Sequence, residues 1–222
     1  MSEWWTYSLS DFLMFSQATY FRLFELQNLA LWPLQVLALG AGIALFVCLW
    51  RGGAKAGRAA ASVLALAWLH VFWRYFGQHY ATINTGAAYL AIGFAVQAVL
   101  LFWLASRRQG ATLTAPAGAS GKLALGIALA GLIVYPLLAP LSGRPWTQAE
   151  LFGLAPDPTV AITLAALILW RAHWLLWIVP LLWSLISSAT LMELHSGQAW
   201  VLFVLALVAA GARWLAARRA QA

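Results

Sequence analysis

The residues that could do chemistry in this chain are few, because only 9% of its 222 residues are Asp, Glu, Lys or Arg. His70 and Arg74 lie four apart in a long apolar stretch, so on a helix they would share one face. An arginine in such a place could bind an anion or a carboxylate partner. In the alternative interpretation it snorkels toward water, and His70 only bonds a neighbouring helix. We expect Arg74 to pair with an acid, with Glu150 as the first candidate.

Three further polar segments carry the remaining candidates, and they cover residues 78–84, 144–159 and 193–197. Histidine and carboxylate side chains suit zinc and similar ions, but no H-x-x-x-H or H-E-x-x-H spacing occurs. The sequence therefore assigns neither a metal nor another cofactor. Asp157, followed by Pro158, is also a good helix N-cap. The candidate binding residues are His70, Arg74, His79, Asn84, Arg144, Glu150, Asp157, Glu193 and His195.

The composition indicates what kind of protein positions these residues. Hydrophobic residues make up 64% of the chain, whereas a soluble domain has about 25% charged residues to cover its surface. We therefore expect an all-α integral membrane protein in contact with the lipid bilayer. The net charge of +7 sits in short basic clusters beside apolar runs, which is typical of membrane topology and not of nucleic-acid binding. The single cysteine, Cys48, excludes an intramolecular disulfide.

Seven apolar stretches are candidates for transmembrane helices in a single membrane domain of residues 1–222. The fifth is short for a full crossing, so six spans plus one re-entrant helix is the alternative. Residues 109–121 are rich in Gly, Ala, Ser and Thr, which predicts a flexible cytoplasmic linker. The predicted spans are 30–50, 59–80, 87–106, 123–141, 159–174, 175–194 and 199–216.

The distribution of charge favours seven spans over six. With the N-terminus outside and the C-terminus in the cytoplasm, ten of the thirteen basic residues lie inside and all six acids lie outside. Six spans would move the three C-terminal arginines outside and remove the positive-inside bias. We expect a multi-pass protein of the bacterial inner (plasma) membrane in this orientation.

Residues 1–28 precede the first predicted span and are not a simple tail. Apolar residues recur through 12–26, and proline disfavours helix at the residue before it, so a new helix must start near Pro33. We predict an amphipathic helix that lies on the outer membrane surface and bends into the first span at that point. It could equally serve only to cover the end of the bundle.

Three segments have a recognisable sequence: Glu150-Leu-Phe-Gly-Leu-Ala-Pro-Asp-Pro-Thr159, Arg74 through Asn84, and Trp177-Ile-Val-Pro-Leu-Leu-Trp183. They resemble the corresponding segments of an uncharacterised family of bacterial polytopic inner-membrane proteins of unknown function. The resemblance implies a bacterial membrane location and transfers no catalytic residue.

Three functions remain open at this point. The leading hypothesis is binding or transport of a small solute or ion at a polar site that faces the periplasm, built around His70, Arg74 and the outer loops. The second is a metal-dependent membrane hydrolase that uses His79, His195, Glu150 and Asp157. The third is an accessory subunit of a larger membrane complex, or a homo-oligomer, whose polar face serves assembly.

Overall fold

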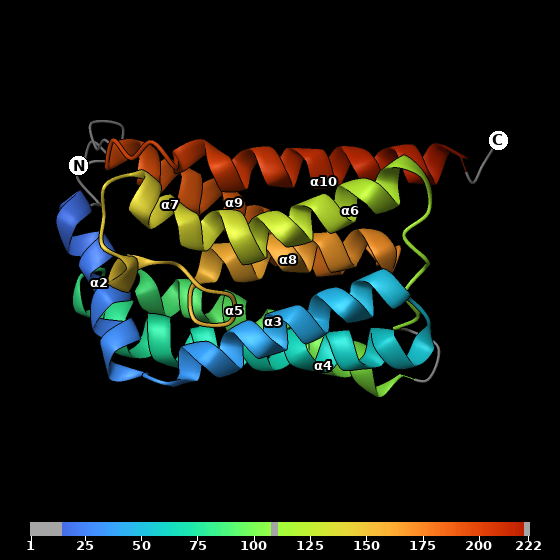
Figure 1. The fold of residues 1–222 in the computed structure, drawn as a ribbon, viewed down its shortest axis with the longest axis horizontal. Helices are drawn as coiled ribbons and strands as arrows, with labels where there is room; N and C mark the ends of the chain where they lie inside the picture. Colours follow the sequence, from blue (N-terminus) through green and yellow to red (C-terminus); the bar gives the residue numbers. More distant parts are fainter. Residues whose placement is uncertain (1–14, 108–110, 220–222) are drawn as a thin grey trace, which may run out of the picture.

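The computed structural model describes residues 15–107 and 111–219, and in these ranges the regular structure is helical (Figure 1). Two of the long helical segments contain π-helical turns, η2 and η4. In chain order the elements are α2 (Gln17–Ala30), α3 (Leu34–Arg51), α4 (Ala54–His70), η2 (Val71–His79), η3 (Tyr80–Thr82), α5 (Ala87–Ser106), α6 (Gly118–Leu129), η4 (Ala130–Val134), α7 (Tyr135–Leu141), η5 (Trp146–Gln148), α8 (Pro156–Leu169), α9 (Leu175–Glu193) and α10 (Ala199–Arg219).

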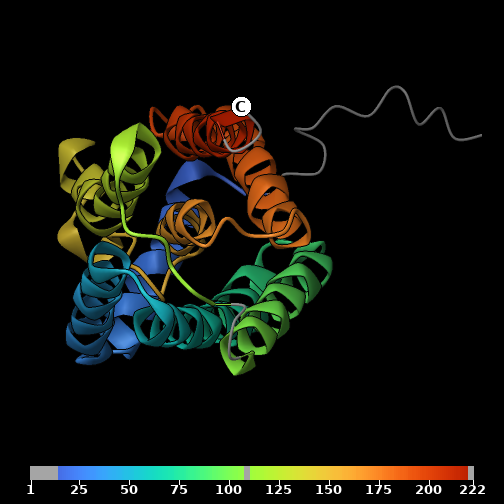
Figure 2. The same ribbon diagram turned by 90° about the vertical axis from the view of Figure 1, so that its right-hand side faces the viewer.

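Six helical segments are long and apolar enough to cross a membrane, and they form a closed ring. Neighbours in the ring are α3, α4, α5, α9, α10 and α6, with α6 returning to α3 (Figure 2). Many large apolar side chains on the outside of this ring are exposed, which fits contact with lipid. The structure thus confirms an all-helical, membrane-type bundle.

The short helix α8 lies in the centre of the ring (Figure 2). All of its residues are buried, against α4, α6, α9 and α10. Its 14 residues span about 21 Å, less than the roughly 30 Å of a bilayer core. A helix enclosed by protein on every side does not need to match the thickness of the lipid. This explains why its sequence is too short for an ordinary span.

Helix α2 lies across one end of the bundle, nearly perpendicular to the long helices (Figure 1). Ser16 caps its first turn, and Tyr20, Phe21 and Phe24 are buried beneath it. It ends at Ala30 and α3 begins at Leu34, so the predicted bend near Pro33 is confirmed. Residues 1–14 of the predicted surface helix lie outside the described residues, and its position on the membrane surface stays a prediction. We call this end of the bundle the α2 end.

The segment predicted as a flexible linker over 109–121 is anchored where the structure describes it. The backbone of Leu113 pairs with that of Gly53, and Thr114 donates to the carbonyl of Leu169 through both its backbone N–H and its hydroxyl. The indole of Trp170 donates to the carbonyl of Ala111 at 3.1 Å. Helix α6 already begins at Gly118, so the connection is also shorter than predicted. The small residues of this segment therefore allow its backbone to lie close to neighbouring helices, and the described part of the segment is held by hydrogen bonds instead of being a flexible linker.

At Gly57, helix α4 lies in direct contact with the backbone of the 111–114 segment, and a substitution at this position can test how close the contact is. A Cβ atom added at Gly57 would lie 1.6 Å from the carbonyl oxygen of Ala111. We expect Gly57→Ala to displace the 111–114 backbone and to destabilise the protein by about 1–3 kcal/mol, measured by thermal unfolding in detergent micelles. Gly126→Ala, on α6, is the matched control, because nothing lies within 4 Å of its added Cβ. Equal melting temperatures for the two variants would contradict this account.

Candidate functional site

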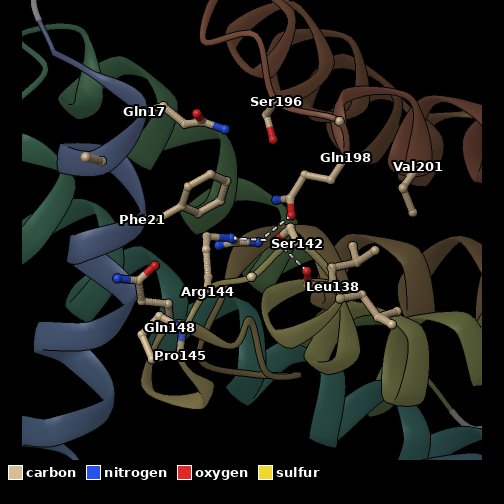
Figure 3. A pocket seen from close by; sticks show the side chains of 14 residues that line it. Gln17, Phe21, Leu138, Ser142, Arg144, Pro145, Gln148, Ser196, Gln198 and Val201 are labelled. Atoms are coloured by element: carbon tan, nitrogen blue, oxygen red, sulfur yellow. Dashed lines mark hydrogen bonds between the residues drawn. The ribbon is translucent and has the colours of Figure 1, made fainter.

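A pocket with a volume of about 550 Å³ opens at the α2 end of the bundle (Figure 3). It lies among α2, the last turn of α7, the loop that follows α7, and the start of α10. One wall of the pocket is apolar and the other is polar. The charged residue of the polar wall is Arg144. The polar lining residues are Gln17, Ser142, Arg144, Gln148, Ser196 and Gln198, and the apolar ones include Ala18, Phe21, Leu138, Leu141 and Val201.

The guanidinium group of Arg144 is half-buried and held on three sides. Its Nε donates to the hydroxyl of Ser142 at 3.0 Å, and its Nη2 donates to Oε1 of Gln198 at 2.7 Å. Its Cζ lies 3.5 Å from the centre of the Phe21 ring, a cation–π contact from α2. The remaining nitrogen, Nη1, is shielded and has no hydrogen-bond partner. The side chain is therefore fixed in place with one donor group unused.

Gln198 connects Arg144 to an acid beneath the pocket. Its Nε2 donates to Oε1 of Glu150 at 2.7 Å, while Oε2 of Glu150 is buried without a partner. The side chain of Glu150 is 2% exposed. Burial raises the pKa of Glu150 most strongly, and the charge of Asp157 raises it further. Gln198 and Arg144 act in the opposite direction, and the resulting pKa is about 8.

Asp157 is the second buried acid, and its carboxylate accepts hydrogen bonds from two donor groups of α9. Oδ1 accepts from the indole of Trp183 at 2.8 Å, and the hydroxyl of Ser187 lies within 2.9 Å of both carboxylate oxygens. The prediction that Asp157 is the N-cap of its helix is wrong. The N-cap is Ala155 and Pro156 is the first helical residue. The Asp157 carboxylate joins α8 to α9 instead of closing its own first turn.

Buried tyrosines surround the two acids. The hydroxyls of Tyr75 and Tyr135 are buried without a hydrogen-bond partner. Both lie close enough to Glu150 and Asp157 for their charges to interact. Tyr75 lies in the π-helical turn η2, and Tyr135 directly follows the π-helical turn η4. The acids and these tyrosines form a polar cluster inside a mostly apolar bundle.

The structure brings Arg144, Glu150 and Asp157 together but leaves other predicted site residues elsewhere. Arg74 donates to Gln78, one turn away on its own helix. The charges near Glu150 are those of Arg144 and Asp157. The predicted pairing of Arg74 with Glu150 is therefore wrong. The reason is geometric: the loop after α7 supplies an arginine much closer to Glu150 than the one on η2.

The remaining candidates are scattered. His70 lines an apolar groove between α3 and α4, and its Nε2 has no partner. Asn84 donates to the hydroxyl of Tyr80 at 2.9 Å and accepts from the backbone of Gly86, which stabilises a turn. Glu193, the last residue of α9, and His195, in the turn after it, are both exposed. His79, at the end of η2, is half-buried. Within the described ranges, no three His, Cys, Asp or Glu side chains are arranged to hold a metal ion.

Sequence reasoning missed the residues that connect the site. Gln198 follows the third polar segment directly, and its position at the start of α10 gives it the reach to contact both Arg144 and Glu150. Ser187 and Trp183 are four apart on α9, so they share one face of that helix. A polar residue and an indole at this spacing in an apolar helix are the signal that could have indicated a buried acceptor.

Comparison with known proteins agrees with the resemblance noted in the sequence. No curated protein and no solved structure matches the chain. A family model described as a family of unknown function matches residues 17–221, which includes every element from α2 to α10. The match also contains Arg144, Glu150, Asp157 and Gln198. The chain belongs to this family, DUF6064.

Proposed function

We propose that this protein is a seven-span membrane protein that binds a small organic anion in the pocket at its α2 end, on the outer side of the membrane. The observation that carries the proposal is the Arg144 guanidinium group. It lines the pocket, is fixed by Ser142, Gln198 and Phe21, and keeps one nitrogen without a partner.

Two features support the seven-span arrangement. Helix α8 runs along the bundle axis, roughly parallel to the six long helices; it begins inside the bundle and ends toward the end opposite α2 (Figure 1). Exposed tryptophans also lie toward both ends, as expected for membrane interfaces. They are Trp32, Trp146 and Trp200 at the α2 end, and Trp50, Trp103, Trp174 and Trp214 toward the other.

The basic residues support the orientation. Arg51, Lys55 and Arg58 flank the turn between α3 and α4, at the end opposite α2. Arg171 follows α8 at that same end, and Arg213 and Arg218 lie in the last turns of α10. The positive-inside rule assigns this end to the cytoplasm and the α2 end to the outer side.

Cysteine labelling tests this topology. In a Cys48→Ala background we expect Glu193→Cys to react with a membrane-impermeant maleimide on intact spheroplasts. Arg171→Cys should react only after the membrane is opened. Both native side chains are exposed, so the two sites are matched in accessibility. Labelling of Arg171→Cys from outside would show that α8 does not cross, or that the orientation is inverted.

The lining of the pocket indicates the class of anion. Leu138, Leu141 and Val201 form an apolar wall beside the charged group. A carboxylate bound at Arg144 could therefore place a short hydrocarbon body against that wall. A charged hydrogen bond of this kind is worth roughly 1.5–3 kcal/mol. The pocket volume of about 550 Å³ is in the usual range for a small-molecule site.

Binding of hexanoate to the protein in phosphatidylcholine nanodiscs tests the proposal. We expect saturable binding by calorimetry, and Arg144→Gln should weaken it at least tenfold, because about 1.4 kcal/mol corresponds to a factor of ten. Arg22→Gln is the matched control, since Arg22 is an exposed arginine on α2. Hexylammonium, which carries the opposite charge on the same chain, should not bind at Arg144.

Two results would contradict this proposal. One is the absence of hexanoate binding to the native chain, and the other is an equal loss of affinity in both arginine variants. Nanodiscs that contain phosphatidylglycerol distinguish a free anion from a lipid headgroup. If the anionic lipid removes hexanoate binding, the pocket holds a lipid and not a solute.

A further inference from the structure

Glu150 does not line the pocket of the anion site described above, yet it is hydrogen-bonded to Gln198, which does. The side chain lies below the pocket, and Gln198 lies between it and Arg144. The amide oxygen of Gln198 accepts from Arg144, while the amide nitrogen donates to Glu150. Only the Gln198 side chain therefore links Arg144, where the anion would bind, to the carboxyl group of Glu150.

Glu150 has one acidic neighbour, Asp157, and one basic neighbour, Arg144, so this region contains two acids and one cation. The titratable and charged groups that interact with it are Arg144 from the loop after α7, Asp157 from α8, Tyr20 from α2, Tyr75 from η2 and Tyr135 from α7. Ionisation of both acids beside one arginine leaves a net negative charge in a buried region. Such a charge is costly unless it is compensated.

The two acids differ in how well their ionised forms are stabilised. Asp157 accepts hydrogen bonds from Trp183 and Ser187, and the latter contacts both of its oxygens. Glu150 accepts one, from Gln198, and its Oε2 has none. Donors to a carboxylate favour its charged form. A proton shared between these acids therefore resides on Glu150.

We propose that Glu150 is a proton-binding site whose protonated form binds the anion, so that the protein takes up a proton together with the anion wherever Glu150 is ionised beforehand. The inference rests on the anion site proposed above. The proton comes from the aqueous phase and forms an O–H bond at Oε2 of Glu150, the carboxylate oxygen without a partner. A neutral Glu150 leaves the Arg144 charge free to bind the anion, whereas an ionised Glu150 competes for that charge.

The direction of the pH dependence follows from the same argument. Burial and Asp157 raise the pKa of Glu150 to about 8. Below this pH the acid is already neutral, so the affinity for the anion should be nearly constant. Above it each anion must bring a proton. Linkage then requires the affinity to fall about tenfold for each further pH unit.

Calorimetry of hexanoate binding between pH 6.5 and 9.5 tests the coupling. Hexanoate remains ionised throughout this range, so its own titration does not contribute. At pH 9, titrations in two buffers of different ionisation enthalpy should show uptake of close to one proton per anion bound. Glu150→Gln should bind hexanoate with an affinity that hardly changes with pH, and without proton uptake.

The control variant is Glu193→Gln, which removes an exposed acid at the same end of the bundle and should keep the native pH dependence. Binding of hexanoate that is independent of pH in the native chain would overturn the coupling while leaving the anion site intact. A pH dependence that persists in Glu150→Gln but disappears in Asp157→Asn would overturn the assignment to Glu150.

Infrared spectroscopy tests the proton site without any anion. The difference between the native protein and Glu150→Gln should contain the carbonyl stretch of a protonated carboxylic acid, lost only as the pH rises through about 8. Absence of this band at pH 6.5 would overturn the proton site. If the band is present but hexanoate does not bind, the anion proposal and its coupling fail, and the proton site stands.

Discussion

The carboxylate of Asp157 has to find its hydrogen-bond donors inside the protein, because Asp157 lies in the first turn of α8, a helix that is buried along its whole length. Neither lipid nor bulk water can stabilise a charge in such a place. The indole of Trp183 and the hydroxyl of Ser187 supply the hydrogen bonds, and both come from α9. This requirement fixes the rotation of α9 relative to α8. It also brings α10, which follows α9 after a short turn, to the position from which Gln198 reaches Glu150.

Helix α2 completes the site by covering it. Its Phe21 ring lies against the Arg144 guanidinium, and its Gln27 donates to the carbonyl of Leu154 in the loop before α8. Asn28 donates to the carbonyls of Thr147 and Ala149 in the same loop. These amide contacts hold residues 147–154 in one conformation. A segment that carries both Glu150 and the entry to α8 is thus stabilised by side chains more than a hundred residues earlier in the chain.

Composition and hydropathy were sufficient to predict the helical membrane-type bundle, because apolar length is set directly by the thickness of a bilayer. They also placed the six long helices, with boundaries within a few residues of those observed. Whether α8 is a full span or a re-entrant helix was harder to predict from the sequence. A helix enclosed by other helices does not need the apolar length that contact with a bilayer imposes. The polar site was predicted only in part. Arg144, Glu150 and Asp157 were all candidates, but periodicity along one helix led to Arg74, whereas the contacts of Glu150 cross between loops and helices.

The π-helical turns show how long apolar spans can present polar groups inward at one end only. In a π-helical turn each hydrogen bond encloses one more residue than in an α-helix, so the residues after it are rotated relative to those before. Within η2, Trp73 is 62% exposed on the outside, whereas Tyr75, two residues further on, is fully buried. In the α6–α7 segment, η4 directly precedes Tyr135, which is buried and interacts with the same two acids. Such irregular turns are frequent at functional sites. Their occurrence in the two spans that supply unpartnered hydroxyls to the cluster indicates that the α2 end is shaped to enclose polar groups, and not only to close the bundle.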